Sequence, residues 1–295
     1  MSRADGAEKG RALMGGRSAT ARRVRPAARI GFIGGGNMAT AMIKGFVAAG
    51  LYRPDQIVVS DVAAGKRSAL ARRLKVAATA ANDEVVRAAA VLVLAVKPQI
   101  MESVLAGLRP HLTPRHLVVS IAGGWPTPRL ERGLGVGARV VRVMPNTPAL
   151  LGKGMAVAVR GRHATEADER LVLRLLRTVG RARAVADERL LDGVTGLSGS
   201  GPAYVYLFAE ALIAGGIAVG LTPDAARELA LQTITGAAAM LQESGDSPAD
   251  LRAAVTSPNG TTFAGLTEME RLGFSAAVQA GIAAATRRAE ELGRE

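Results

Sequence analysis

Short apolar runs and helix-like stretches alternate along the first two thirds of the chain. The apolar runs predict strands at Ile30–Ile33, Ile57–Ser60, Val91–Val96, Leu117–Ile121, Val140–Met144 and Met155–Val159. The stretches between them predict helices at Met38–Ala49, Gly65–Leu74, Asn82–Ala89, Ile100–Leu108 and Thr127–Leu134. Strands separated by helices of this length are typical of a parallel sheet covered on both faces.

The pattern changes after about Asp187, where strand-like runs end. Long helical patterns follow at Gly201–Val219, Pro223–Glu243, Pro248–Val255, Thr262–Leu272 and Ser275–Leu292. Thr222 and Ser247 each stand before a proline, which is a common start signal for a helix. We therefore expect an α/β domain with a mostly parallel sheet over residues 29–187, followed by an all-α domain over residues 188–295.

A glycine-rich turn joins the first predicted strand to the first predicted helix. In "RIGFIGGGNMATAM" the spacing is Gly34-x-Gly36-x-x-Ala39, which has the G-x-G-x-x-G/A form. Gly34 permits a tight turn, Gly36 permits close approach to a pyrophosphate, and Ala39 lets the helix pack on the strand. The free N–H groups of the helix then face the phosphates, so a dinucleotide site with a Rossmann fold is predicted.

The residues after the second strand leave the choice of dinucleotide open. Asp61 is placed to hold a ribose hydroxyl, which favours NAD. Ser60, Lys66 and Arg67 are close in sequence and are equally suited to a 2′-phosphate. Two later turns, Lys97-Pro98 and Gly123-Gly124, follow strands and are either simple strand exits or ligand contacts.

Composition narrows the class of protein. The 295 residues include no cysteine, which removes disulfides and thiolate metal sites and is consistent with a reducing compartment. We expect no metal centre and a cytoplasmic location. The net charge is +13, but arginines and acids are interspersed without interleaved aromatics, so we expect no nucleic-acid partner.

Two stretches need a separate interpretation. Residues 1–28 are rich in Gly, Ala, Ser and Arg without apolar periodicity, and we expect a flexible Arg-rich leader there. Residues 203–221 are nearly long enough to span a membrane. Glu210 near the centre and the pair Gly215–Gly216 favour a helix buried in a large helical assembly, with no membrane contact.

The distribution of proton donors limits the chemistry. All three histidines lie in the first domain, and the last lysine is Lys153. A hydroxy-acid oxidation needs a general base near neutrality, and the helical domain offers only hydroxyls, carboxylates and amides, so the base would have to be a histidine or lysine reaching over from the first domain. Reduction of a protonated C=N bond needs only positioning and one hydrogen-bonding group at nitrogen.

Two hydroxyl-rich segments are predicted to lie at helix entries. The first is "AVTSPNGTTFAGL", in which Ser257, Gly260, Thr261 and Thr262 are suited to cradle a carboxylate. The second is "GLSGSGPAY", residues 196–204, before the first long helix. Ordinary helix capping is the favoured explanation of the first segment when it is taken alone, whereas two such segments in one domain support a binding site as well as they support capping.

Together the motifs resemble one known family. "GFIGGGNMA", "AVKPQ", "SIAGG", "MPNTP", "VTGLSGSGPAYVY" and "VTSPNGTT", in this order, are similar to those of pyrroline-5-carboxylate reductases. The resemblance covers residues 29 to about 290. It implies a Rossmann domain, a helical dimerisation domain and homodimers, with decamers of five dimers in some members. It also implies reduction of the C=N bond of 1-pyrroline-5-carboxylate to L-proline, the last step of proline biosynthesis, usually by NADPH and otherwise by NADH.

The resemblance also implies roles for individual residues. It implies cofactor contacts at Ile33, Gly34, Gly35, Gly36, Asn37, Met38, Ser60, Asn82, Ala95, Val96, Lys97 and Pro98. The substrate would be bound by Ser257, Gly260, Thr261 and Thr262. Thr262 would lie near the ring nitrogen as the catalytic hydrogen-bonding partner or proton donor. The site would form between one subunit's Rossmann domain and helices of the dimer.

Two positions depart from the family pattern, and two other functions remain open. Asn259 stands where the family usually has glycine, and Asn tolerates left-handed backbone angles better than most residues. Ala254 stands where some relatives have an asparagine that touches the cofactor. The alternatives are a β-hydroxyacid dehydrogenase, which needs a lysine early in its helical domain, and a non-catalytic NAD(P)-sensing or scaffold protein.

Overall fold

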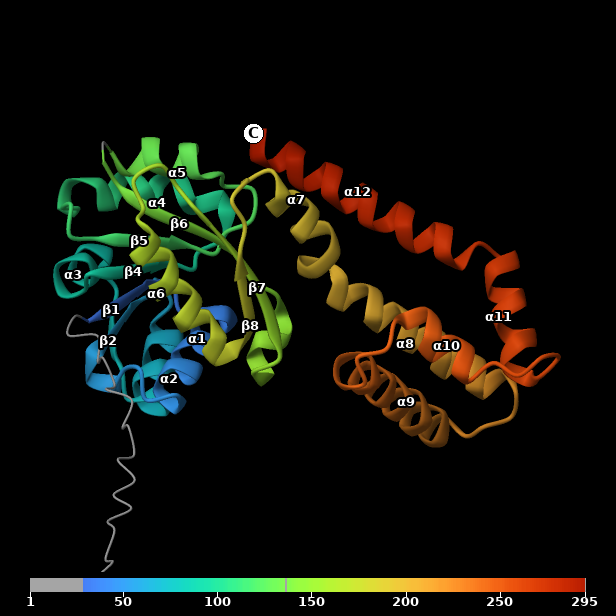
Figure 1. The fold of residues 1–295 in the computed structure, drawn as a ribbon. Helices are drawn as coiled ribbons and strands as arrows, with labels where there is room; N and C mark the ends of the chain where they lie inside the picture. Colours follow the sequence, from blue (N-terminus) through green and yellow to red (C-terminus); the bar gives the residue numbers. More distant parts are fainter. Residues whose placement is uncertain (1–28, 136, 295) are drawn as a thin grey trace, which may run out of the picture.

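The computed structural model describes residues 29–135 and 137–294 (Figure 1). The predicted leader, residues 1–28, lies outside this range. In Figure 1 the sheet and its helices form one part of the molecule, and the later helices extend away from it before the last one returns.

Within the described residues, one sheet has the strand order β3-β2-β1-β4-β5-β6-β7-β8. The strands are β1 (Ile30–Ile33), β2 (Ile57–Ser60), β3 (Ala77–Thr79), β4 (Val91–Leu94), β5 (Leu117–Ser120), β6 (Arg139–Met144), β7 (Gly154–Arg160) and β8 (Gly180–Ala184). Neighbouring strands are parallel except β6 and β7. The expected mostly parallel sheet is confirmed.

Helices cover both faces of this sheet. They are α1 (Asn37–Ala48), α2 (Ala64–Leu74), α3 (Asn82–Ala88), α4 (Met101–Leu108), α5 (Thr127–Leu134) and α6 (Glu166–Leu176). Short 3-10 turns connect them at η1 (Pro54–Gln56), η2 (Pro98–Ile100), η3 (Arg109–His111), η4 (Thr147–Leu151) and η5 (Arg177–Val179). Side chains of α1 and α6 pack into one apolar core and those of α3, α4 and α5 into the other, as in a doubly wound sheet.

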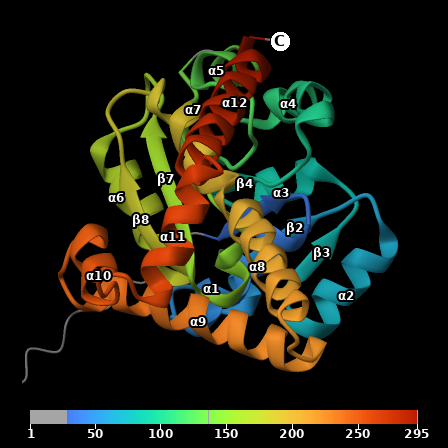
Figure 2. The ribbon, with the colours of Figure 1, turned by 90° about the vertical axis from the view of Figure 1, so that its right-hand side faces the viewer.

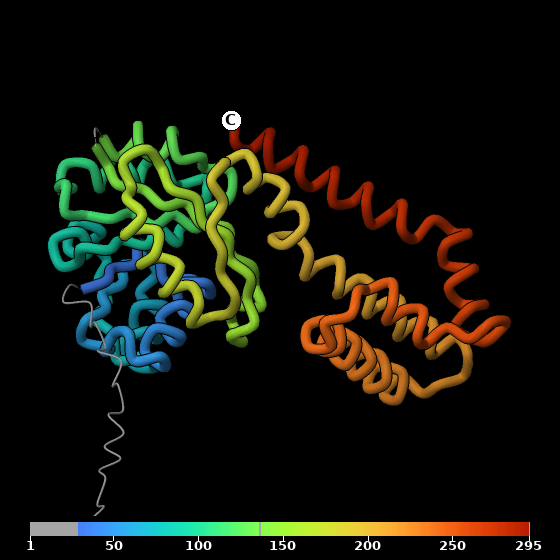
Figure 3. Tube along the Cα trace, in the orientation of Figure 1, coloured from blue at the N-terminus to red at the C-terminus, as the bar shows by residue number. Residues whose placement is uncertain are grey.

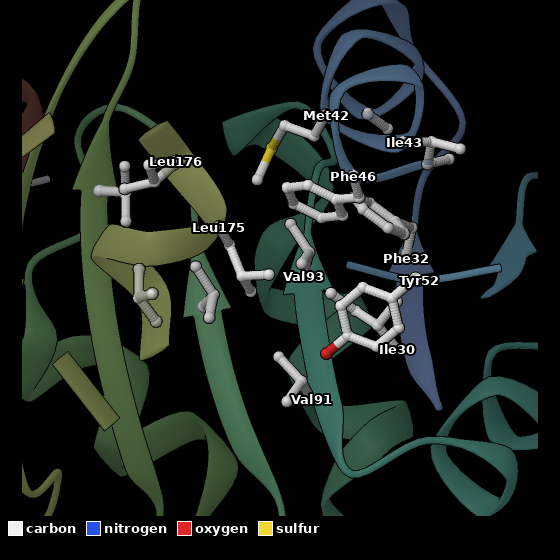
Figure 4. Packing of buried hydrophobic residues seen from close by; sticks show 14 of the residues in the cluster. Ile30, Phe32, Met42, Ile43, Phe46, Tyr52, Val91, Val93, Leu175 and Leu176 are labelled. Carbon is white, nitrogen blue, oxygen red and sulfur yellow. The ribbon is translucent and has the colours of Figure 1, made fainter. Parts of the chain in front are cut away.

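The larger core contains an aromatic row. The ring centroids of Phe32 and Phe46 lie 6.0 Å apart, and those of Phe46 and Tyr52 lie 6.1 Å apart. Figure 4 shows these rings beside Ile30 and Val93, between strands and α1. These aromatic pairs add to the burial of the aliphatic side chains that make up most of this core.

The sequence missed three elements of this part. Strand β3 is three residues long and partly exposed, and α6 fell in a stretch rich in charge. Strand β8 lies at the edge of the sheet, where Arg181 and Arg183 alternate with less exposed positions. Charged side chains on an edge strand block pairing with other chains, and they also hide the strand from an apolar-run criterion.

The remaining described residues after β8 are helical. The elements are α7 (Leu190–Val194), the π-helical turn η6 (Thr195–Gly199), α8 (Gly201–Ala218), α9 (Pro223–Glu243), α10 (Pro248–Ala254), α11 (Thr261–Arg271) and α12 (Phe274–Arg294). The two predicted caps are confirmed, because Thr222 accepts from the Ala225 N–H and Ser247 from the Asp250 N–H. The trace in Figure 3 shows α12 returning towards α7.

The predicted helix entry at residues 196–204 is wrong. Helices α7 and α8 run on as one helix, Leu190–Ala218, through η6. Ser200 has helical angles, and its N–H donates to the Thr195 carbonyl at 2.9 Å in π register. Gly196 packs so closely on α12 that an added Cβ would collide with Thr286 Oγ1. The small residues of this segment therefore serve helix packing rather than a helix start.

The apolar helix over residues 203–221 is not covered within one chain. Leu190–Ala218 is, by length and composition, long and apolar enough to cross a membrane, and none of its most apolar window is buried. Val205, Tyr206 and Leu207 are among its exposed side chains. Figure 2 shows α8 lying in front of the sheet without a helix over its outer side. The expected burial is absent from the single chain.

Candidate active site

The residues expected to contact a dinucleotide meet at one edge of the sheet. Strand β1 lies between β2 and β4, so the turns after these three strands are adjacent. The Gly34 N–H donates to the Ser60 carbonyl at 2.8 Å, and the Ala95 N–H donates to the Ile33 carbonyl at 2.8 Å. This edge holds the carboxyl ends of parallel strands at the switch point of the strand order, where such sheets bind ligands.

The expected residues all lie on the turns at this edge, at the ends of β1, β2 and β4 and at the start of α3. Ile33 ends β1, Gly34–Gly36 form the turn, and Asn37 and Met38 open α1. Ser60 ends β2 and Asn82 opens α3. Residues 95–98 follow β4, with Pro98 opening η2. The structure thus brings the whole expected cofactor set together.

The three glycines of the turn differ in what surrounds them. Gly34 has φ +100°, and a Cβ there would lie 2.5 Å from the Ala95 carbonyl oxygen. A Cβ on Gly35 would lie 2.5 Å from Leu70 Cδ1. A Cβ on Gly36 would have nothing within 4 Å. Gly34 is therefore required by the backbone, a side chain on Gly35 would need Leu70 to move, and the space over Gly36 is open for a ligand phosphate.

The N-terminus of α1 is suited to an anion. Its N-cap is Gly36, it has no side-chain cap, and its first turn holds no acidic residue. Helix α6 shows the opposite arrangement, with a Thr165 capping box and acidic residues in its first turn. Free N–H groups and the partial positive charge of a helix start stabilise phosphate. The observed turn therefore fits the diphosphate of a dinucleotide.

Asp61 is fixed beside this turn. Its Oδ2 accepts from the Gly35 N–H at 3.0 Å and its Oδ1 accepts from the Ala63 N–H at 2.9 Å. Lys66 Nζ lies 3.7 Å from Oδ2. Burial alone would raise the pKa of Asp61, but the two backbone N–H groups and Lys66 outweigh it and lower the pKa below its ordinary value. The carboxylate is ionised at neutral pH.

The other polar groups near the end of β2 already have partners. The Ser60 side chain is fully buried, and its Oγ donates to Asn82 Oδ1 at 2.7 Å. Arg67 Nη1 donates to the carbonyl oxygens of Asp61 and Val62 at 2.8 and 2.9 Å. These bonds hold the turn after β2 in one conformation.

The turns after β4 and β5 line a cavity of about 350 Å³ together with α12. Trp125 Nε1 donates to the Pro98 carbonyl at 3.1 Å, which ties the two turns together. Gly124 has φ +71°, and a Cβ there would lie 3.1 Å from Leu292 Cβ. Gly124 therefore packs closely against α12 and also borders the cavity.

The hydroxyl-rich loop stands at the start of α11. Gly260 is the N-cap, and Thr261 and Thr262 are the first helical residues. Asn259 has φ +58°, so it takes the left-handed conformation that its chemistry allows. The Gly260 N–H donates to the Ser257 carbonyl at 3.0 Å, and a Cβ on Gly260 would collide with Ser257 Oγ. The turn is compact in spite of Asn259.

This helix start differs from those of its neighbours. Helix α11 has no side-chain cap and no acidic residue in its first turn. Helices α9 and α10 have hydroxyl caps and an aspartate in the first turn. Ser257, Thr261 and Thr262 are all exposed in the single chain. Capping therefore does not explain this loop, and its free N–H groups suit a carboxylate.

One chain does not bring the two expected sites together. In Figure 1 the α10–α11 junction lies at the outer end of the helical part, away from the sheet edge that holds the glycine-rich turn. Helix α8 lies between them in the same view. The residues expected to bind cofactor around Gly36 and substrate around Thr262 therefore lie apart in the single chain, and we refer to these two expected sites as half-sites.

Sequence reasoning missed one residue that joins the two parts. Asn146 Nδ2 donates to the Ser198 carbonyl in η6 at 3.1 Å, and its Oδ1 accepts from the Met155 N–H at 2.8 Å. A π-turn frees a helix carbonyl, and Asn146 supplies a donor to it. The signal was present in the motifs "MPNTP" and "GLSGSG", but nothing in either motif shows that they touch.

Known proteins match the chain over both parts. Residues 188–292 match the family model for pyrroline-5-carboxylate reductase dimerisation, and residues 29–124 match that for NADP oxidoreductase, coenzyme F420-dependent. The pyrroline-5-carboxylate reductase of Pisum sativum is 43% identical over 89% of this chain and 95% of its own length. The chain belongs to the pyrroline-5-carboxylate reductase family.

Other members of the family extend the match to solved structures. The pyrroline-5-carboxylate reductase of Pseudomonas aeruginosa is 43% identical over 90% of this chain and 97% of its own. The Coxiella burnetii enzyme superposes with a TM-score of 0.84 at 36% identity, over 90% of this chain and 98% of its own. The Plasmodium falciparum enzyme, solved with NADP bound, gives 0.82 at 31% identity, over 91% and 99%. Members of the family that cover nearly the whole chain thus share its fold.

Proposed function

We propose that this protein reduces the C=N bond of 1-pyrroline-5-carboxylate to L-proline, the last step of proline biosynthesis. The observation that carries the proposal is the uncapped, acid-free start of α11 beside Thr262, in a chain of this family. A helix start of this kind holds a carboxylate, and a neighbouring hydroxyl can serve the imine nitrogen.

The glycine-rich edge would hold the reductant. Gly34–Gly36 and the start of α1 would bind the diphosphate, and residues 95–98 after β4 would border the nicotinamide half. A reduced nicotinamide supplies a hydride when it is bound there. The open space over Gly36 and the uncapped N–H groups of α1 fit such a group. The resemblance gives NADPH as the first expectation and NADH as the second.

The α11 loop would orient the substrate. The N–H groups of Gly260 and Thr261 and the hydroxyl of Ser257 would hold the carboxylate. The Thr262 hydroxyl would hydrogen-bond to the ring nitrogen or donate a proton to it. Because a protonated imine already makes its carbon electrophilic, orientation and one hydrogen bond supply most of what the protein must add.

We propose that the complete site forms between two copies of the chain. The two half-sites lie apart in one copy, and the apolar surface of α8 lies uncovered there. A homodimer would cover α8 and bring the α11 loop of one copy near a glycine-rich edge. Five dimers in a decamer would be the larger assembly. We propose a cytoplasmic protein that binds neither nucleic acid nor membranes.

An assay of nicotinamide oxidation with pyrroline-5-carboxylate tests the proposal. The enzyme should turn over this imine and should not oxidise β-hydroxy acids, which would need a catalytic lysine. Folded protein that binds the dinucleotide but does not turn over the imine would favour the sensing or scaffold function instead.

Replacing Thr262 tests its role directly. Thr262→Ala should lower kcat by about tenfold or more, the scale of a modest general-acid or orienting contribution. Thr267→Ala is the matched control, because its hydroxyl lies on the same helix and donates to the Phe263 carbonyl. Kinetics of Thr262→Ala equal to those of the control would remove Thr262 from the mechanism.

A further inference from the structure

We propose that this chain prefers NADH to NADPH, because the carboxylate of Asp61 occupies the place that a 2′-phosphate would need. The inference rests on the proposed function for the identity of the site as a nicotinamide site. It replaces NADPH, the first expectation from the resemblance, with NADH.

Asp61 is held beside the glycine-rich turn. It directly follows β2, and its side chain is 9% exposed. Its Oδ2 accepts from the N–H of Gly35, inside the glycine-rich turn itself. An acidic residue after the second strand of such a sheet accepts a hydrogen bond from the adenosine ribose hydroxyl. Asp61 is therefore fixed at the ribose end of the site rather than free to turn into solvent.

The negative charge of Asp61 disfavours a 2′-phosphate. The Gly35 and Ala63 N–H groups and Lys66 keep the carboxylate ionised, in spite of its burial. A phosphate monoester carries about −1.5 to −2 charges at pH 7. Two like charges in contact at a partly buried position repel strongly, since solvent screens them poorly. NADH places a neutral hydroxyl at this position instead.

The groups that could compensate for this repulsion are already engaged. The Ser60 hydroxyl is buried and donates to Asn82. The Arg67 guanidinium donates to two carbonyl oxygens of the turn after β2. Lys66 lies 3.7 Å from the Asp61 carboxylate and shares its charge with it. These contacts support the Asp61 alternative over the Ser60, Lys66 and Arg67 alternative that the sequence left open.

Direct titration of the full-length protein with NADH and with NADPH tests the inference without turnover. Nicotinamide fluorescence, measured without the imine, should give a Kd for NADH about tenfold or more below that for NADPH, the scale of one repelled charge pair. Equal affinities, or tighter binding of NADPH, would overturn the inference. Because no reaction is involved, the result stands whether or not the imine is the substrate.

Variants at position 61 test whether the Asp61 carboxylate causes the preference for NADH. Asp61→Ser and the isosteric Asp61→Asn should each shift the ratio of the two Kd values towards NADPH by about tenfold. Asp55→Ser removes the same charge from an exposed site paired with Arg53, and it should leave the ratio unchanged. A ratio that does not move in a folded Asp61 variant would contradict the inference. Selective loss of NADPH binding in Lys66→Gln would also contradict it.

Discussion

The α/β part and the helical part of this chain bury their apolar residues very differently. Two large clusters of buried side chains hold the sheet and its helices together. In the helical part, α8 buries no residue, and α9 buries only Ala226 and Ala230 among the described residues. Hydrophobic burial is the main source of folding free energy, so the α/β part is stabilised from within and the helical part needs a second surface.

The same contrast separates the two half-sites. The glycine-rich turn is built on strands whose backbone bonds already fix it, including that from Gly34 to Ser60. The α11 loop is exposed and lies among helices with few buried contacts. A preorganised dinucleotide site and a substrate site that depends on assembly would make activity, but not cofactor binding, sensitive to the oligomeric state.

A charge introduced on α8 should have the largest effect, on both assembly and activity. Leu207 is 67% exposed in the single chain, and Leu207→Glu would place a carboxylate in the surface that a second copy should cover. An unpaired buried charge costs about 3 kcal/mol or more, so association should weaken by about a hundredfold and activity should be lost at working concentrations. Light scattering after gel filtration measures the mass.

Ala71→Glu is the control for this change. It adds the same carboxylate to an exposed position of α2, in the α/β part, and should change neither mass nor activity. In Leu207→Glu the dinucleotide should still bind, because the glycine-rich turn is complete in one chain. A Leu207→Glu protein of unchanged mass and activity would show that α8 is not the covered surface.

Much of the α/β part could be predicted from local pattern, whereas the helical junction could not. The apolar runs and the glycine spacing are local signals, and they predicted β1, α1 and the turn between them. Strand β8 was missed because its exposed arginines give it no apolar run. The α7–η6–α8 helix was misread because its glycines and serines resemble a cap.

What fixes that junction lies far away in sequence. The close approach of Gly196 to Thr286 and the hydrogen bond from Asn146 to Ser198 join residues 90 and 52 positions apart (286 − 196 and 198 − 146). The local pattern of apolar and polar residues in one sequence gives no information about contacts between residues so far apart. The predicted substrate residues share this limit, because they are exposed in the single chain and the surface that we propose to face them belongs to a second copy.

Alanine substitutions in the glycine-rich turn should have the next largest effect. Gly36→Ala meets no atom within 4 Å, so it should leave the melting temperature near that of the parent. It should weaken dinucleotide binding by about tenfold or more, because the methyl group enters the space of the ligand. Binding is measured by nicotinamide fluorescence and stability by thermal unfolding.

Gly34 and Gly65 are the comparisons that show whether effects on dinucleotide binding and on stability can be separated. Gly34→Ala has a strained φ and a contact with the Ala95 carbonyl, so it should lower the melting temperature. Gly65→Ala lies in α2 with open space around it and should raise stability by up to about 1 kcal/mol without affecting binding. Full dinucleotide affinity in Gly36→Ala would show that the open space there is not the ligand's.

The smallest expected effect is on the free energy of unfolding, when one tyrosine hydroxyl is removed from each part. The Tyr52 hydroxyl lies in the aromatic row without a hydrogen-bond partner among the described residues. The Tyr204 hydroxyl donates to the Gly196 carbonyl at 3.1 Å. Tyr52→Phe should therefore be neutral or stabilising, by up to about 1 kcal/mol, whereas Tyr204→Phe should lose about 1 kcal/mol. Urea unfolding at neutral pH measures both.

Alkaline pH should enlarge the Tyr52 difference. Burial raises the pKa of Tyr52 to about 12 from 10.0, with a smaller opposing effect of the Arg174 charge. Between these values the unfolded chain loses the phenol proton while the folded chain keeps it, so stability falls as pH rises, by up to about 1.4 kcal/mol per pH unit. Tyr52→Phe should lack this part of the loss. Stability is compared from about pH 9.5 to 11, a range around the ordinary phenol pKa. Identical slopes for parent and variant would mean that the Tyr52 hydroxyl reaches solvent. The core of the α/β part would then be less well buried than the contrast with the helical part requires.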